Sequence, residues 1–415
     1  MLVLLALIIF CLFVLGVSKP TYYIIVYVLI STKFLGFWAA GDNFLLFGFG
    51  VFIPLVNLVT LISALCNKRV LDIPRKAIWF TLGLVSFFLY GLFYPVFVGY
   101  EGFMSSIIAS KSFWVVSLWV YLVVYRPRLD IDRIIEFIKF VGVYIACIYI
   151  FYTLFSIAPP YYLDGSQSVR ASFPTYMMLA MFFYYFQWRD GDVKKIKLLI
   201  MSSILFLGIL LVGRKSCIIT IIISFSLLAV MGSRGNFNFQ KIVLFIIIAL
   251  VGIFLLSFTP SYNKTYHRVV SVANSQDSSL SSRNIYNQFR WDAINKSPLL
   301  GYGFMYKDTK LVKQYRNISN NRFSERFGVV DSGYVDLLIK FGFIGLFLYF
   351  MLWARQILPI LLRPRKYDWL KISMSIYLLQ YFFIDYTWSV LTYSFGLIPA
   401  FLALYLMIFG LNKRV

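Results

Sequence analysis

The sequence predicts an all-α polytopic integral membrane protein, with about 12–13 transmembrane helices and one large extracytoplasmic loop that contains short helices. Of the 415 residues, 60% are hydrophobic and 20% are aromatic, which is more apolar surface than a soluble domain can bury. The apolar residues fall in segments of roughly 17–25 residues, the length that crosses a bilayer. A single long polar stretch, from about Ser257 to Phe341, interrupts them.

Polar breaks between the apolar segments give the positions of the spans. The first segment lacks a basic start and a small-residue cleavage site, which favours a first helix over a removed signal. The whole chain, 1–415, is therefore predicted to be a single transmembrane domain, with 260–332 as a large periplasmic loop within it. The predicted spans are 1–17, 21–39, 44–66, 77–98, 107–125, 134–158, 174–188, 196–212, 216–231, 241–259, 333–353, 371–388 and 390–410.

The basic residues predict the orientation of these spans. The chain has 39 Lys and Arg against 17 Asp and Glu, a net charge of +22, and 18 of the basic residues lie in five connections of one parity. The short connections of the opposite parity carry only Lys111, Arg170, Arg214 and Lys215. The richer set is expected in the cytoplasm. The long loop then lies outside the cytoplasm, which is the periplasmic side if the cell is Gram-negative. A bilayer-embedded chain offers no groove-reading module, so we expect no nucleic-acid partner.

The middle of the long loop is predicted to form an amphipathic helix that begins after Ser281-Ser282 and ends at Pro298. Its two faces differ in chemistry. One face is apolar and is expected to pack on the membrane helices; it carries Ile285, Tyr286, Phe289 and Ala293. The other face aims two guanidinium groups along one line; it carries Arg283, Asn287 and Arg290.

Arg214 and Lys215 lie in a turn, Gly213–Ser216, between two apolar segments on the predicted outer side. Two cations there go against the positive-inside tendency, and the dipole at a helix start favours anions. A bound phosphate would account for both features, because free N–H groups and two cations form an anion cradle. The alternative is a pair of basic residues that reach lipid headgroups. Arg170, in the preceding outer connection, is a further candidate for binding a phosphate.

Asp331 precedes Ser332 and Gly333 at the start of the next apolar segment. It is either an N-terminal cap of that helix or a group that deprotonates or orients a sugar hydroxyl. Asp336 and Lys340 are four residues apart and are expected to pair. His267 is the only histidine, and no metal-ligand cluster or nucleotide-binding loop accompanies it. We therefore expect no metal or other cofactor, and chemistry that rests on arginines and a few carboxylates.

At these residues the sequence resembles the superfamily of Wzy-like O-antigen polymerases and WaaL-like O-antigen ligases. Four stretches carry the resemblance, and together they cover roughly the C-terminal 60% of the chain. In order they are Arg170–Pro174, the turn Gly213–Ser216, the run from Arg283 through Arg290-Trp291, Pro298, Gly301 and Gly303, and Asp331–Gly345. Asp331 stands where ligases typically have a histidine, which favours the polymerase branch.

The resemblance implies a metal-independent glycosyltransferase of lipopolysaccharide and polysaccharide biosynthesis. It would move a growing glycan from undecaprenyl diphosphate to the next lipid-linked repeat unit. The partners would be undecaprenyl-diphosphate-linked oligosaccharides, the bilayer and a chain-length regulator protein. The implied catalytic residues are Asp331, Arg283 and Arg214. The implied substrate-binding residues are Arg170, Lys215, Asn287, Arg290 and Tyr334.

Two other functions stay open at this point. An O-antigen ligase would use the same donor with a lipid-core acceptor, and the aspartate at position 331 argues against it. A lipid-linked oligosaccharide flippase or other transporter would also be basic and polytopic. Transporters concentrate charge between helices at mid-membrane, however, and the long outer loop here does not fit that pattern.

Overall fold

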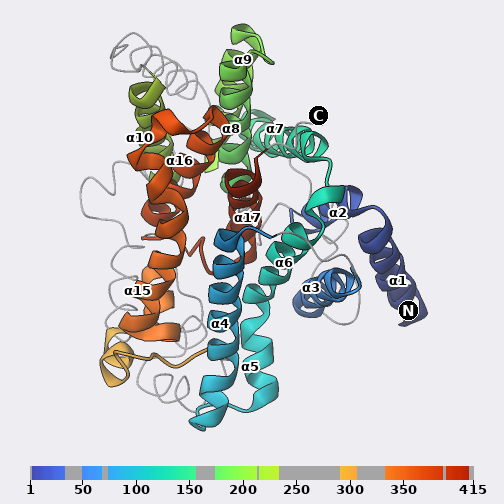
Figure 1. Cartoon of the computed structure of the whole chain (residues 1–415), viewed down its shortest axis with the longest axis vertical. Helices are drawn as coiled ribbons and strands as arrows, with labels where there is room; N and C mark the ends of the chain where they lie inside the picture. The colour runs from blue at the N-terminus through green and yellow to red at the C-terminus, as the bar shows by residue number, and fades with distance from the viewer. Residues whose placement is uncertain are drawn as a thin grey trace.

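Figure 1 shows a computed structural model of the chain, in which every regular element of the described part is a helix. The described residues are 2–32, 49–67, 73–155, 173–212, 215–232, 290–305, 332–386 and 389–410. Within these ranges, five helices are long and apolar enough to cross a membrane, and several shorter apolar helices accompany them. The predicted fold class, a polytopic α-helical membrane protein, is confirmed.

Each predicted span except 241–259 overlaps a described helix, although the helix bounds differ by several residues at some ends, and 241–259 lies outside the described residues. The helices of the N-terminal half are α1 (Leu2–Ser18), α2 (Pro20–Ser31), α3 (Phe49–Leu65), α4 (Arg75–Phe97), α5 (Phe103–Ala109), α6 (Val116–Val124) and α7 (Ile131–Phe155). Those that follow are α8 (Pro174–Asp190), α9 (Lys195–Val212), α10 (Lys215–Gly232), α15 (Gly333–Leu362), α16 (Trp369–Ile384) and α17 (Ser394–Phe409).

Helix α8 is enclosed by its neighbours. Every residue from Pro174 to Phe186 is buried, and the helix packs against α7, α9, α16 and α17. A helix that is apolar on all sides and buried on all sides belongs to the centre of a bundle. Hydroxyl groups still find partners there, since Tyr377 of α16 donates to the carbonyl of Thr175 at 2.9 Å. Such bonds are required where no water reaches the backbone.

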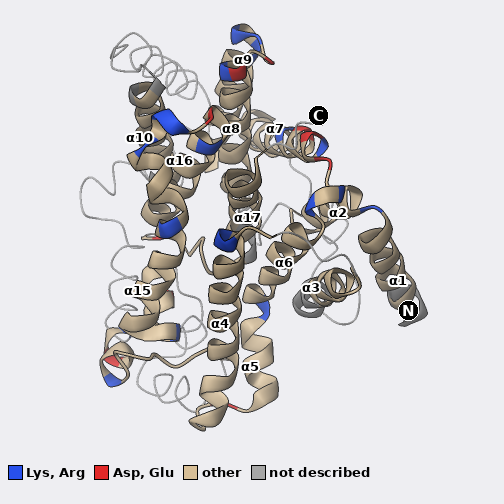
Figure 2. Cartoon of the chain, viewed as in Figure 1, with Lys and Arg blue, Asp and Glu red and all other residues tan. Residues whose placement is uncertain are grey.

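Helices α4 and α15 are apolar on their outer surfaces. Leu89 and Phe93 of α4, and Phe347, Leu348 and Met351 of α15, are all exposed. Exposed apolar side chains in such numbers fit a surface that faces lipid rather than water. Figure 2 shows the Lys and Arg residues of the described helices mainly near helix ends and in connections, as expected if the apolar stretches between them lie in the membrane.

Helix α15 is interrupted at Gly342, whose φ of 63° and ψ of −172° are not helical. The interruption frees backbone groups on both sides, and residues 298–304 of the long loop bind to them. Tyr302 and Gly303 donate N–H groups to the carbonyls of Ile339 and Lys340, each at 2.8 Å. Phe343 donates in turn to the carbonyl of Pro298 at 2.8 Å. The broken helix and the loop thus complete each other's backbone hydrogen bonds, which is what buried backbone requires.

The glycines of this region are needed because the backbones lie in contact. A Cβ on Gly301 would lie 2.6 Å from the backbone nitrogen of Gly342, and a Cβ on Gly303 would lie 2.4 Å from Pro95 of α4. The next residue, Phe304, donates its N–H to the carbonyl of Gly91 of α4 at 2.7 Å. Part of the long polar stretch is therefore built into the membrane helices at this point.

Candidate active site at the start of helix α15

Three helices meet helix α16 through their first turns. Thr175, the second residue of α8, accepts a hydrogen bond from Tyr377. Cys217, in the first turn of α10, is fully buried, and α10 packs against α16. Gly333, the first residue of α15, donates its N–H to the carbonyl of Asp385, just past the end of α16, at 2.7 Å. The positive ends of three helix dipoles therefore gather along the C-terminal half of α16, an arrangement that favours an anion.

Each of these helices follows a stretch in which the sequence predicts a site residue. Arg170 precedes α8, Arg214 and Lys215 flank the start of α10, and Asp331 precedes α15. Arg170, Arg214, Arg283, Asn287 and Asp331 lie outside the described residues. Lys215 begins α10, but the position of its side chain is not described. The assignment of these residues to a site stays a prediction, and what the structure adds is the common location of the helix starts.

Asp385 is the carboxylate at this location that sequence reasoning missed. It is fully buried, and its Oδ1 accepts the N–H groups of Val390 and Leu391 at 2.9 and 3.1 Å. Its Oδ2 is also buried and has no hydrogen-bond partner among the described residues. The predicted span 371–388 contained Asp385, and an ionisable residue in an apolar segment is itself a signal of function.

Asp385 lies in the connection between α16 and α17, just past the last residue of α16. Asp336 and Lys340 of α15 are the charged side chains nearby, and the two backbone N–H groups are its hydrogen-bond donors.

Gly333 lies in contact with Asp385, and there is no room between them for a side chain at position 333. A Cβ at Gly333 would lie 2.1 Å from the carboxyl carbon of Asp385. Because the backbone of Gly333 also bonds to the Asp385 carbonyl, the first turn of α15 is held at one fixed position. Asp331 is two residues before this point in the sequence. Asp385 is thus well placed to position the segment that carries the predicted acceptor-binding carboxylate.

The predicted pair of Asp336 and Lys340 is confirmed. Lys340 Nζ lies 2.7 Å from Asp336 Oδ2, and Asp336 is buried. The same ammonium group lies 5.6 Å from the ring centroid of Tyr393, in the connection before α17. The pair therefore links the second turn of α15 to the connection that also surrounds Asp385, and a buried charge is tolerated because it is paired.

Tyr334 has a structural contact in addition to its predicted role in substrate binding. Its hydroxyl donates to the carbonyl of Phe382 in α16, and its ring meets Phe350 edge to face at 5.2 Å. Like the backbone bond of Gly333, the bond to Phe382 holds the start of α15 on α16, whereas Phe350 lies in α15 itself, beyond the break at Gly342. The role of Tyr334 at a substrate stays a prediction.

The interpretation of two separate faces on the loop helix needs a correction at Arg290. In the described helical residues 290–296, Arg290 is buried together with Ala293 and Ile294. Ala293 and Ile294 form a small buried cluster with Tyr302 and with side chains of α15. Residues 290, 293 and 294 occupy neighbouring positions on a helix, so the side that packs on α15 includes the arginine. The guanidinium of Arg290 is therefore withdrawn from solvent.

The described helices define a multi-pass membrane protein. Residues 198–350 match the family model described as O-antigen ligase, so the resemblance to the O-antigen polymerase and ligase superfamily is confirmed for this part of the chain. Members of this family are glycosyltransferase-like enzymes. The matched segment runs from α9 into α15 and includes positions 214, 283 and 331, whereas Arg170 and Asp385 lie beyond its ends. No curated protein matches the chain.

Proposed function

We propose that this protein is a surface-polysaccharide polymerase, a glycosyltransferase that moves a growing glycan from undecaprenyl diphosphate to the next lipid-linked repeat unit. The observation that carries the proposal is the gathering of three helix starts on α16, each beside a predicted cation or carboxylate. A diphosphate carries the charge that such a site favours, and it is its own leaving group. The site would face the periplasm from the bacterial inner membrane, as the distribution of basic loops predicts.

In the proposed reaction, a hydroxyl oxygen of the acceptor sugar attacks the anomeric carbon of the donor glycan. The bond between that carbon and the diphosphate oxygen breaks, and the diphosphate leaves with the electron pair. Arg214 and Arg283 stabilise the charge that develops on the leaving group, and Arg170, Lys215 and Arg290 help to bind it. Asp331 orients the acceptor hydroxyl or takes its proton, with Asn287 and Tyr334 at the sugars.

The described residues would contribute by holding this arrangement rigid. Asp385 touches no solvent and therefore acts as a positioning residue for the first turn of α15. The pair of Asp336 and Lys340 ties the next turn to the connection before α17. A site fixed in this way presents its charges without reorganisation during the reaction, which is the main source of electrostatic catalysis.

An O-antigen ligase is the second candidate, because the matched family model carries that description. It shares the donor and the diphosphate site and differs in its acceptor, a lipid core in place of a second repeat unit. The aspartate at position 331 favours the polymerase. A flippase transfers no glycan, so it would need no residue that orients or deprotonates an acceptor hydroxyl.

The test uses the purified full-length protein, a lipid-diphosphate repeat unit and a chelator, with products separated on a gel. A polymerase yields a ladder, a ligase yields product only when lipid core is added, and a flippase yields neither. We expect Arg214→Ala to lower ladder formation roughly 100-fold or more, since one charge-stabilising donor is lost. Arg128→Ala, at an exposed arginine outside the site, should retain the wild-type rate. Undiminished polymer from the triple variant Arg214→Ala, Arg283→Ala, Asp331→Ala would refute the proposal.

A further inference from the structure

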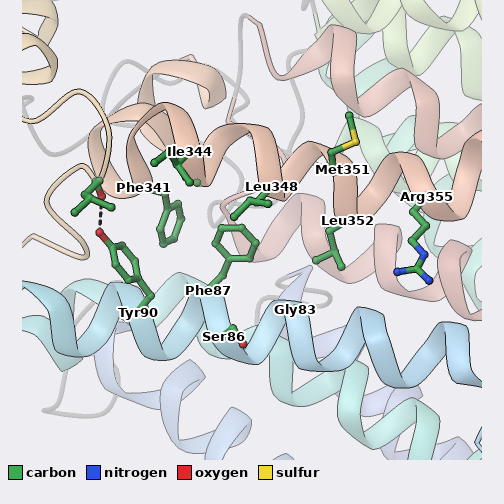
Figure 3. A pocket seen from close by; sticks show the side chains of 12 residues that line it. Gly83, Ser86, Phe87, Tyr90, Phe341, Ile344, Leu348, Met351, Leu352 and Arg355 are labelled. Atoms are coloured by element: carbon green, nitrogen blue, oxygen red, sulfur yellow. Dashed lines mark hydrogen bonds between the residues drawn. The ribbon is translucent and has the colours of Figure 1, made fainter.

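A cavity of about 480 Å³ lies between α4 and α15, along the apolar surface of the bundle. Figure 3 shows Phe87 and Tyr90 of α4 facing Phe341, Leu348 and Leu352 of α15 across it. The glycan-transfer site proposed above makes no use of this cavity. Its walls are almost entirely hydrocarbon and aromatic, which suits a lipid chain and not a sugar or a diphosphate.

The shape of this groove is that of a channel along the helices. On α15 its lining runs from Phe341, just before the break at Gly342, to Arg355, and the continuous helical part from Ile344 to Arg355 is about 17 Å long at the rise of an α-helix. One leaflet of the hydrocarbon core is about 15 Å thick. Leu348 and Met351, on its rim, are half or more exposed, so the groove opens toward the surrounding lipid. An acyl chain can therefore lie along it for the depth of a leaflet.

One end of the groove is cationic. Arg355 lines that end, and Figure 3 shows its guanidinium directed from α15 toward α4. Its neighbour Gln356 donates to the carbonyl of Lys76 at 3.5 Å, which brings the basic first turn of α4, Arg75 and Lys76, to the same end. All three basic residues are exposed, and within the described residues none forms an ion pair with a carboxylate.

We propose that this groove is a binding site for an anionic phospholipid, with an acyl chain between α4 and α15 and the phosphate at Arg355 and Lys76. Basic residues at the ends of membrane helices attract anionic headgroups, and Arg binds phosphate through paired donors. The cationic end lies beside the first turn of α4, and neither Gly333 nor Asp385 is among the residues that line the groove. The lipid is therefore a second ligand, distinct from a diphosphate at the glycan-transfer site.

The test compares two lipids with the same acyl chains on full-length protein purified in detergent and stripped of lipid. Phosphatidylglycerol is expected to raise the melting temperature more than phosphatidylcholine. Arg355→Gln is expected to bind phosphatidylglycerol about tenfold more weakly, measured by native mass spectrometry, and to lose this preference. Leu348→Trp, which fills the groove, should weaken binding of both lipids. Both substitutions are at exposed side chains, so the variants should fold.

Arg365→Gln is the matched control, since it removes an exposed arginine from the short helix Pro364–Lys366 outside the groove. It should bind both lipids as the wild type does. Equal stabilisation by the two lipids, or a preference that survives Arg355→Gln, would overturn the proposal. The proposal would also be overturned if a polyprenyl phosphate displaced phosphatidylglycerol and Arg355→Gln had no effect on that displacement. The groove would then hold the tail of the carrier lipid.

Discussion

Replacing Gly333 by alanine is expected to lower glycan transfer about 100-fold while leaving the protein folded in the membrane. The added methyl group would lie 2.1 Å from the carboxyl carbon of Asp385, which is fully buried and held by two backbone N–H groups. Asp385 cannot move aside, so the first turn of α15 must move instead. A displacement of about 1 Å at a reacting group can cost two orders of magnitude in rate.

The gel assay for polymer, run on equal amounts of purified protein, measures this effect. Gly102→Ala is the matched control, because no atom lies within 4 Å of the added methyl and the backbone of Gly102 is extended. It should polymerise at the wild-type rate. If Gly333→Ala were fully active, the start of α15 would not be part of the site. If it failed to accumulate in the membrane, the contact would be one of stability alone.

Replacing Gly342 by alanine is expected to be strongly destabilising. The φ of 63° with ψ of −172° is a conformation that is almost restricted to glycine, and forcing another residue into it costs about 1–3 kcal/mol. The added Cβ would also lie 2.2 Å from the carbonyl oxygen of Leu299, where the loop crosses the broken helix. The overlap adds a similar amount. We expect a melting temperature lower by roughly 5 °C or more.

Thermal unfolding of the purified variant in detergent measures the loss, with Gly102→Ala again as the control. The contacts at Gly342 include both the loop and α15, so weaker polymer formation should accompany the lower melting temperature. An unchanged melting temperature would mean that the loop does not bind at the break in α15. The predictions at Gly333 and Gly342 are distinct, since the first is for activity and the second for stability.

The structure gives a physical reason for the glycines in the stretches that resemble the superfamily. In the turn Pro298–Gly303 and at Gly342, the absence of side chains lets a loop donate and accept backbone hydrogen bonds inside a broken membrane helix. In a bilayer such bonds are obligatory, because no water replaces them. The motif therefore anchors the long loop at α15, beside the helix start that is predicted to carry the acceptor-binding carboxylate.

The sequence by itself determined the class of the protein, the positions of its helices and the pairing of Asp336 with Lys340. These follow from local rules: apolar length sets a span, and a spacing of four sets a helical pair. The tertiary structure alone decided the break at Gly342, the burial of Arg290 and the partnership of Gly333 with Asp385. Each of these joins residues that are distant in the chain, and neither hydropathy nor periodicity carries information about such contacts.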